Sequence, residues 1–200
     1  MSETALLSHK YLQQTFTIQH DQSDCGVACL LSLIQYYGGS NNLEKLRELS
    51  GTTKQGTTLL GLYQAANQLG FSALGNEADL QAVIDHKEPL ILHVVIEDRL
   101  QHYVVCYGYE KDKFIIGDPA KGITTYTKKE LESVWKSKTC LTLKPNDDFV
   151  RTKTQNKNKK QWFLKLLKED YRLISFSVLL GLAIAILGMA VGVIFSNRKL

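Results

Sequence analysis

The sequence predicts an α+β domain over residues 1–147, with helices in its first half and an antiparallel sheet in its second, followed by a separate apolar helix. Three observations support this prediction. Apolar residues recur at helical spacing before residue 86, short β-rich runs begin at residue 90, and residues 173–195 carry no charge. Helices and strands that are segregated along the chain are typical of α+β folds.

Four helices are expected in the first half of the domain, at 24–37, 43–49, 58–69 and 79–85. The first is followed by Gly38 and Gly39 and the third by Gly70, and glycine commonly ends a helix.

Five strands are expected in the second half, at 90–96, 102–109, 113–117, 123–126 and 139–143. Between the last two, Thr127 and Glu130 have the spacing of a capping box and should start a short helix that runs through Trp135.

Charge is distributed unevenly along the chain. Residues 1–150 carry 14 Lys or Arg against 18 Asp or Glu, whereas residues 151–172 contain eight basic residues against two acidic ones. A domain with an acidic balance lacks the basic surface that nucleic acid requires, so we expect no nucleic-acid partner.

The cysteines do not form a disulfide or metal-binding pattern. Cys25 and Cys29 would share a helix face, but a second pair is missing, and structural zinc needs four ligands. Residues 1–20 contain no apolar run of the length that a secretory signal needs. We therefore expect no metal, no cofactor and a reducing, cytoplasmic environment for the domain.

Two short segments separate the domain from the apolar helix. Residues 148–161 contain too little apolar surface to fold and are expected to be a solvated, basic linker. In residues 162–172, aromatic and leucine side chains recur at helical spacing against basic ones. This pattern predicts a helix in the membrane interface, with an amphipathic core helix as the alternative.

The uncharged run at 173–195 contains 23 residues and, as a helix, would be about 34 Å long, enough to span a bilayer. A buried core helix is the alternative, although it would be unusually long. Eight basic residues precede the run, while Arg198 and Lys199 follow it, so the positive-inside rule places the domain on the cytoplasmic side of a cell membrane.

Cys25 is the candidate nucleophile. It lies between the polar run 19–24 and an apolar helix, where unpaired N–H groups and the helix dipole favour a thiolate. Simple packing, the usual role of a buried cysteine, is the alternative. Cys29 lies one turn further along among apolar residues, so we expect an unreactive core thiol there.

His102 is the candidate base, because it begins a strand and can point into a cleft. His20 is close to Cys25 in sequence and is its only rival. His93 lies inside an apolar strand, where a structural role is expected.

Asp118 is the candidate residue that orients the base. It ends the strand after His102, and a hairpin with its midpoint near Glu110 and Lys111 would bring the regions of His102 and Asp118 together. The alternative is a local cap in the turn that contains Pro119.

These residues resemble the signature of the bacteriocin-processing peptidases that form the N-terminal domain of peptidase-containing ABC transporters. The resemblance covers about residues 14–145 and rests on Gln19 and the runs 24–30, 102–105 and 118–122. It implies a papain-like fold and cleavage after a double-glycine leader. It also implies an oxyanion role for Gln19, for which the alternative is an ordinary surface glutamine.

The resemblance further implies partners: a leader peptide, the lipid bilayer, and the transmembrane and nucleotide-binding domains of a homodimeric exporter. No Gly-x-x-x-x-Gly-Lys-Ser/Thr phosphate loop occurs in this sequence, so we expect no ATPase domain in it. The chain would be part of a longer exporter, which we favour, or a membrane-tethered peptidase. A module that binds leaders without cutting them and a papain-like acyltransferase are the other functions considered.

Overall fold

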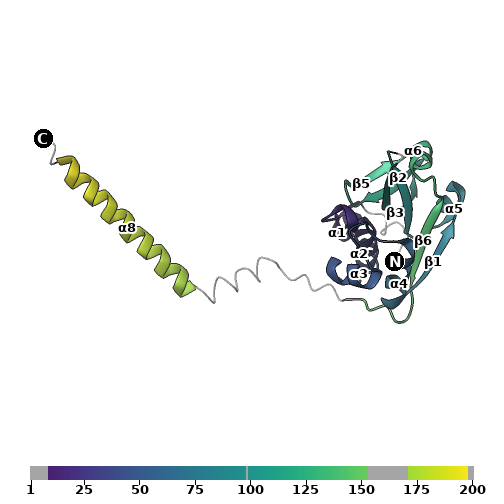
Figure 1. Ribbon diagram of the computed structural model, residues 1–200, viewed down its shortest axis with the longest axis horizontal. Helices are drawn as coiled ribbons and strands as arrows, with labels where there is room; N and C mark the ends of the chain where they lie inside the picture. Colours follow the sequence, from purple (N-terminus) through teal and green to yellow (C-terminus); the bar gives the residue numbers. More distant parts are fainter. Residues whose placement is uncertain (1–8, 98, 153–170, 198–200) are drawn as a thin grey trace. The chain divides into compact units, whose positions relative to one another are not determined.

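A computed structural model describes residues 9–97, 99–152 and 171–197 (Figure 1). The chain divides into two compact units, Met1–Thr154 and Gln155–Leu200.

The helices of the first unit agree with the sequence prediction to within one or two residues, apart from a first helix that was not expected. Their bounds are α1 His9–Thr15, α2 Cys25–Tyr36, α3 Leu43–Ser50, α4 Leu59–Gln68, α5 Leu80–Asp85 and α6 Lys128–Val134, with a 3₁₀ turn, η2, at Gln22–Asp24. Four of them begin at side chains that accept a backbone N–H of the first turn: Asn42, Thr58, Asp79 and Thr127. The Thr127–Glu130 capping box is confirmed.

The strands form one antiparallel sheet in the order β1-β6-β2-β3-β4-β5. Their bounds are β1 Phe71–Glu77, β2 Leu90–Ile96, β3 Leu100–Glu110, β4 Lys113–Asp118, β5 Gly122–Tyr126 and β6 Thr139–Pro145. Strand β1 was not predicted, because only Phe71 is fully buried in a run that also contains Gly75 and polar residues. It is a strand because all of it pairs with β6.

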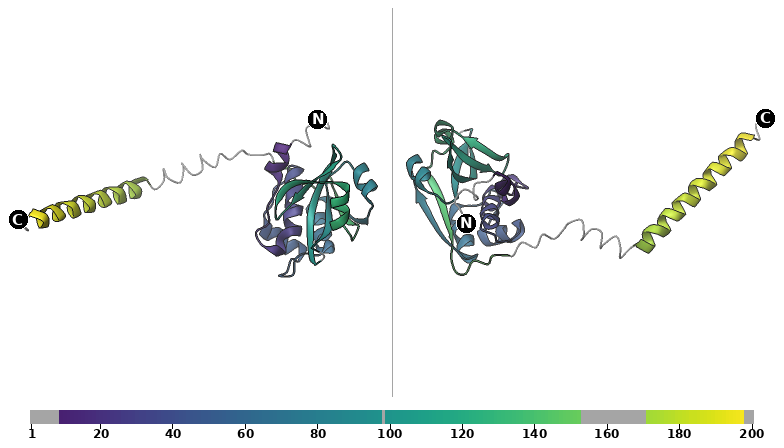
Figure 2. Two further views of the ribbon diagram at one scale, coloured as in Figure 1. Left: turned by 90° about the horizontal axis from the view of Figure 1, so that it is seen from above. Right: turned by 180° about the vertical axis from the view of Figure 1, so that it is seen from behind.

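Alternate residues of the sheet face two different cores. The helices α1 to α4 cover one face, which Figure 2 shows as the side occupied by the purple and blue helices. The other face packs against α5 and α6 and contains the buried Trp135. Along β3, Tyr103 and Val105 face the first core, while Val104 and Cys106 face the second.

The β3–β4 hairpin turns one residue later than predicted. Glu110 pairs with Lys113, and the two residues between them, Lys111 and Asp112, have positive φ angles of 51° and 61°. This combination is typical of a type I′ hairpin turn. A bulge between Cys106 and Gly108 shifts the register along the strands.

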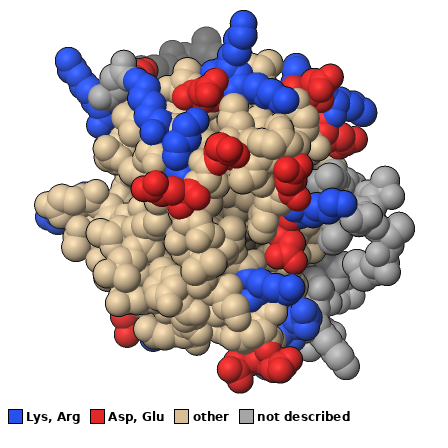
Figure 3. Space-filling model, turned by 90° about the vertical axis from the view of Figure 1, so that its right-hand side faces the viewer, with Lys and Arg blue, Asp and Glu red and all other residues tan. Residues whose placement is uncertain are grey.

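Acidic and basic side chains are interspersed on the face of the molecule shown in Figure 3, around a broad uncharged area. Side chains of both signs therefore contribute to the electrostatic field on this face.

The second unit contains one helix among its described residues, α8 Tyr171–Asn197. Within the described part of the chain, no helix combines the length and the apolar character that crossing a membrane demands. Most of the predicted linker at 148–161 and of the interfacial helix at 162–172 lies outside the described residues.

Candidate active site

Cys25 begins α2 directly after the short 3₁₀ turn η2, as the sequence predicted. Its side chain is almost fully enclosed, with 6% exposed. The next residue, Gly26, leaves no free space: a Cβ added there would lie 3.2 Å from Leu62, and 3.3 Å from both Thr57 and Tyr103. The chain beside the thiol is therefore confined between α4 and β3.

His102, near the start of β3, is 4% exposed. Its Nε2 is 2.8 Å from Oδ1 of Asp118. Burial acts to lower the pKa of His102, but the hydrogen bonds to Asp118 and Cys25 outweigh it and raise the pKa to about 9. Because Asp118 occupies Nε2, Nδ1 is the ring nitrogen left for the thiol.

Asp118 ends β4 and is completely buried. Its Oδ1 also accepts the backbone N–H of Ala120 at 2.9 Å. The carboxylate therefore caps the turn that follows β4 and contacts the imidazole of His102 at the same time. Burial acts to raise the pKa of Asp118, but the hydrogen bonds from His102 and Ala120 hold the pKa below its ordinary value. Oδ2 has no hydrogen-bond partner, and the Nζ of Lys121 lies 3.9 Å away.

Gln19 is tied to the loop that follows Asp118, because its backbone N–H donates to the carbonyl of Pro119 at 3.0 Å. The segment before it is held from the other side, where the N–H of Thr17 donates to Oγ of Ser32 on α2 at 2.9 Å. The Oε1 of Gln19 is buried without a hydrogen-bond partner. The structure thus places Gln19 beside the loop of the third candidate residue.

The rival base and the second thiol are not part of this arrangement. His20 is exposed, whereas His102 is buried and lies 2.8 Å from Asp118. Half-buried His93 packs its ring against Tyr103 at a centroid distance of 5.1 Å. Cys29 is fully buried, and burial raises the pKa of its thiol well above the ordinary value, as expected of an unreactive core thiol.

Sequence reasoning missed a buried ion pair next to the nucleophile. Asp24, which precedes Cys25, has no exposed surface and binds the guanidinium of Arg47 through both carboxylate oxygens. The position of Asp24 next to Cys25 is a visible signal, but nothing in the sequence links it to a residue on α3.

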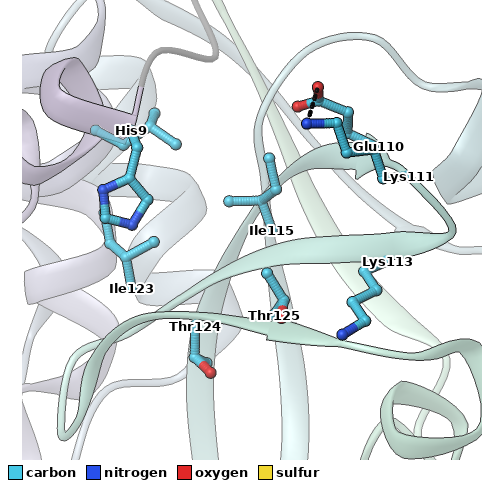
Figure 4. Close-up of a pocket in the computed structure, with 9 residues that line it drawn as sticks. His9, Glu110, Lys111, Lys113, Ile115, Ile123, Thr124 and Thr125 are labelled. Carbon is cyan, nitrogen blue, oxygen red and sulfur yellow. Dashed lines mark ion pairs between the residues drawn. The ribbon is translucent and has the colours of Figure 1, made fainter.

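A cavity of about 670 Å³ lies elsewhere, between α1 and the β3–β5 strands (Figure 4). It is lined by side chains that include His9, Ile115 and Ile123, and none of the four candidate site residues is among them. The candidate active site is therefore distinct from this cavity.

Comparisons with known proteins agree with the geometry. The sequence model of the Peptidase C39 family matches residues 13–148. The transport/processing ATP-binding protein ComA of Streptococcus pneumoniae is 35% identical over 184 residues, which cover 90% of this chain and 25% of ComA. The lactococcin-G-processing and transport ATP-binding protein LagD of Lactococcus lactis is 40% identical over 119 residues, which cover 58% of this chain and 17% of LagD. The chain spans a quarter or less of the length of these relatives.

A solved structure supports the same assignment. The crystal structure of a double glycine motif protease from an AMS/PCAT transporter, in complex with its leader peptide, matches with a TM-score of 0.60 at 28% identity. The match covers 64% of this chain and 89% of that one. The first unit therefore has the papain-like α+β fold of these peptidases, and because the family model matches more than half of the sequence, the chain belongs to the Peptidase C39 family.

Proposed function

We propose that the first unit is a cysteine endopeptidase that removes double-glycine leader peptides from bacteriocins or other secreted peptide precursors. The observation that carries this proposal is the buried contact of 2.8 Å between His102 Nε2 and Asp118 Oδ1, beside a buried Cys25 whose interaction with His102 favours the protonated imidazole. A base that is oriented by a third group is the common arrangement for activating a cysteine nucleophile.

In the proposed reaction, the Cys25 thiol gives its proton to His102, and the sulfur attacks the carbonyl carbon of the scissile peptide bond. The protonated His102 then gives its proton to the leaving amine, and a thioester to Cys25 remains. Water, deprotonated by His102, attacks the thioester and releases the leader. Asp118 holds the Nε2–H tautomer, which keeps Nδ1 directed at the sulfur.

The oxyanion of each tetrahedral intermediate needs donors, and we assign this role to the Gln19 side-chain amide and the Cys25 backbone N–H. Two observations support Gln19. Its backbone N–H is bonded to Pro119, one residue after Asp118, and its Oε1 is buried, so the side chain enters the protein next to the loop that follows Asp118. Donors that are positioned before the reaction stabilise the developing charge most effectively.

The substrate class is taken from the relatives. LagD is named for the processing of lactococcin G, and the matching crystal structure contains a double glycine motif protease with its leader peptide. The similarity to both supports a peptide precursor with a double-glycine leader as the substrate of this chain.

We also propose that the domain works as part of an exporter, on the cytoplasmic side of the cell membrane. The alignment with ComA covers 90% of the chain and so extends past the peptidase domain, and residues 173–195 contain 23 successive uncharged positions. In this proposal residues 148–161 are a linker, 162–172 lie in the membrane interface and 173–195 span the bilayer. The partners are the transmembrane and nucleotide-binding domains of a homodimeric ABC transporter.

The test is cleavage of a synthetic precursor that carries a leader ending in Gly-Gly, followed by mass spectrometry. We expect the wild-type chain to cut after the second glycine, Cys25→Ala to be inactive, and Cys140→Ala to be active, because Cys140 lies on β6 in the other core. Cleavage by Cys25→Ala at the wild-type rate would contradict the mechanism. Binding of the leader without cleavage by the wild type would instead identify a leader-binding module.

A further inference from the structure

The aspartate that precedes the nucleophile does not cap the helix that it starts. Asp24 occupies the N-cap position of α2, where an aspartate side chain normally accepts N–H groups of the first helical turn. Its side chain makes no such bond. It turns back instead, and its Oδ2 accepts the backbone N–H of Asp21 at 3.0 Å.

Arg47 holds the carboxylate in this turned-back position. Its Nε donates to Oδ1 of Asp24 at 2.8 Å and its Nη2 donates to Oδ2 at 2.6 Å, which is a two-point contact with defined geometry. The other carboxylates near the guanidinium are more distant, at 3.9 Å for Asp21 and 4.0 Å for Glu44. Asp24 is fully buried, so Arg47 is the counter-charge that makes its burial tolerable.

The position of this carboxylate matters for chemistry at Cys25. Without Arg47, the carboxylate of Asp24 would lose its two-point contact and its counter-charge while it remains next to Cys25 in the chain. Its unpaired negative charge would then oppose the negative charge that develops on an oxyanion bound at the Cys25 N–H.

We propose that Arg47 is a positioning residue for cleavage: it fixes and neutralises the Asp24 carboxylate, so that no unpaired negative charge lies beside the Cys25 N–H that serves the oxyanion. This inference rests on the proposed peptidase function. In this proposal Arg47, on α3, affects the cleavage rate through Asp24 and not by contact with the substrate.

The experiment measures kcat and KM for cleavage of the Gly-Gly precursor by the 200-residue chain, together with the rate at which iodoacetamide alkylates Cys25. We expect Arg47→Ala to lower kcat by about 10- to 100-fold with less than about a threefold change in KM. Replacing Asp24 as well, in Asp24→Ala/Arg47→Ala, removes the competing carboxylate and should restore most of the lost kcat. A purely structural ion pair would instead lower the folded fraction of Arg47→Ala, which urea unfolding measures, and would leave kcat per folded molecule unchanged.

Lys45→Ala is the matched control, because Lys45 lies on the same helix and pairs with exposed Glu48 at 2.9 Å, away from Asp24. It should keep wild-type kinetics. If Arg47→Ala does not fold, Arg47→Lys retains the charge with a poorer contact and should lose about three- to tenfold in kcat.

Wild-type kcat in Arg47→Ala or Arg47→Lys overturns the proposal, as does a double variant no faster than Arg47→Ala. A wild-type chain that fails to cleave counts against the proposed function itself. If the wild type cleaves the precursor and Arg47→Ala cleaves it with the same kcat, this inference fails while the proposed function stands.

Discussion

Nε2 of His102 and Oδ1 of Asp118 lie 2.8 Å apart with both side chains buried, although 16 residues separate them along the chain. The pair joins the start of β3 to the end of β4, so its geometry depends on the hairpin register. Because it is shielded from water, the pair is far less screened by salt than a surface ion pair would be. The base of the proposed reaction is therefore oriented by the sheet.

Asp118→Asn tests how much of this orientation is electrostatic. The amide retains the shape and one acceptor oxygen but removes the charge that stabilises protonated His102. We expect the pKa of His102 to fall from about 9 towards its ordinary value near 6.5, and kcat/KM to fall by about 10- to 100-fold. Ring proton titration by NMR and cleavage assays measure the two effects. Asp147→Asn, at an exposed position, should change neither.

The same pair makes stability depend on pH. The pKa of His102 is about 9 in the folded protein and near 6.5 when unfolded, so its stabilising contribution is complete below pH 6.5 and is lost as the pH rises to 9. The loss should be at most about 3.5 kcal/mol, since one pKa unit corresponds to ~1.4 kcal/mol. Urea unfolding at pH 6 and pH 9.5 measures it.

His102→Gln supplies the reference for this pH effect, because other titrating groups are common to both chains and cancel. The free energy of unfolding of the wild type should exceed that of His102→Gln by more at pH 6 than at pH 9.5. An equal difference at the two pH values would show that the imidazole does not carry the effect.

Gln19→Ala should separate binding from chemistry. A donor to the oxyanion acts mainly in the transition state, so we expect kcat to fall by about 100-fold while KM changes little. Gln14→Ala, at an exposed position on α1, is the matched control and should behave as the wild type. A rise in KM at unchanged kcat would instead assign Gln19 to substrate binding.

Gly117→Ala should disturb the packing between β4, which ends at Asp118, and the segment that leads to Gln19. A Cβ there would lie 2.5 Å from Phe16 and 2.9 Å from Tyr107, so both rings must move, at a cost of about 1–3 kcal/mol. Phe16 begins the segment that leads to Gln19, so cleavage should slow as well.

Gly75→Ala is the control for this effect, since Gly75 is also a strand glycine but its nearest neighbour, Leu59, lies at an ordinary 3.8 Å. Its free energy of unfolding should stay within about 0.5 kcal/mol of the wild type. Thermal unfolding of both variants measures the two changes in the free energy of unfolding. Similar changes for Gly117→Ala and Gly75→Ala would refute the packing argument.

Local patterns in the sequence were sufficient to predict most of the domain. Helical spacing of apolar residues located α2 to α5, and the Thr127–Glu130 capping box located α6, because caps and periodicity involve residues only a few positions apart. The position of Cys25 between a polar loop and an apolar helix is local for the same reason, and the structure has it at the first residue of α2.

The tertiary structure alone decided the features that depend on distant partners. Strand β1 has a weak apolar pattern and forms through its pairing with β6, about 70 residues later in the chain. The pairing of His102 with Asp118 follows from the sheet, whereas His20 stays exposed. The Asp24–Arg47 pair likewise requires α3 to pack beside α2. Each of these is a contact between segments that only folding brings together, and the free energy that selects it comes from burial and hydrogen bonding across the whole domain.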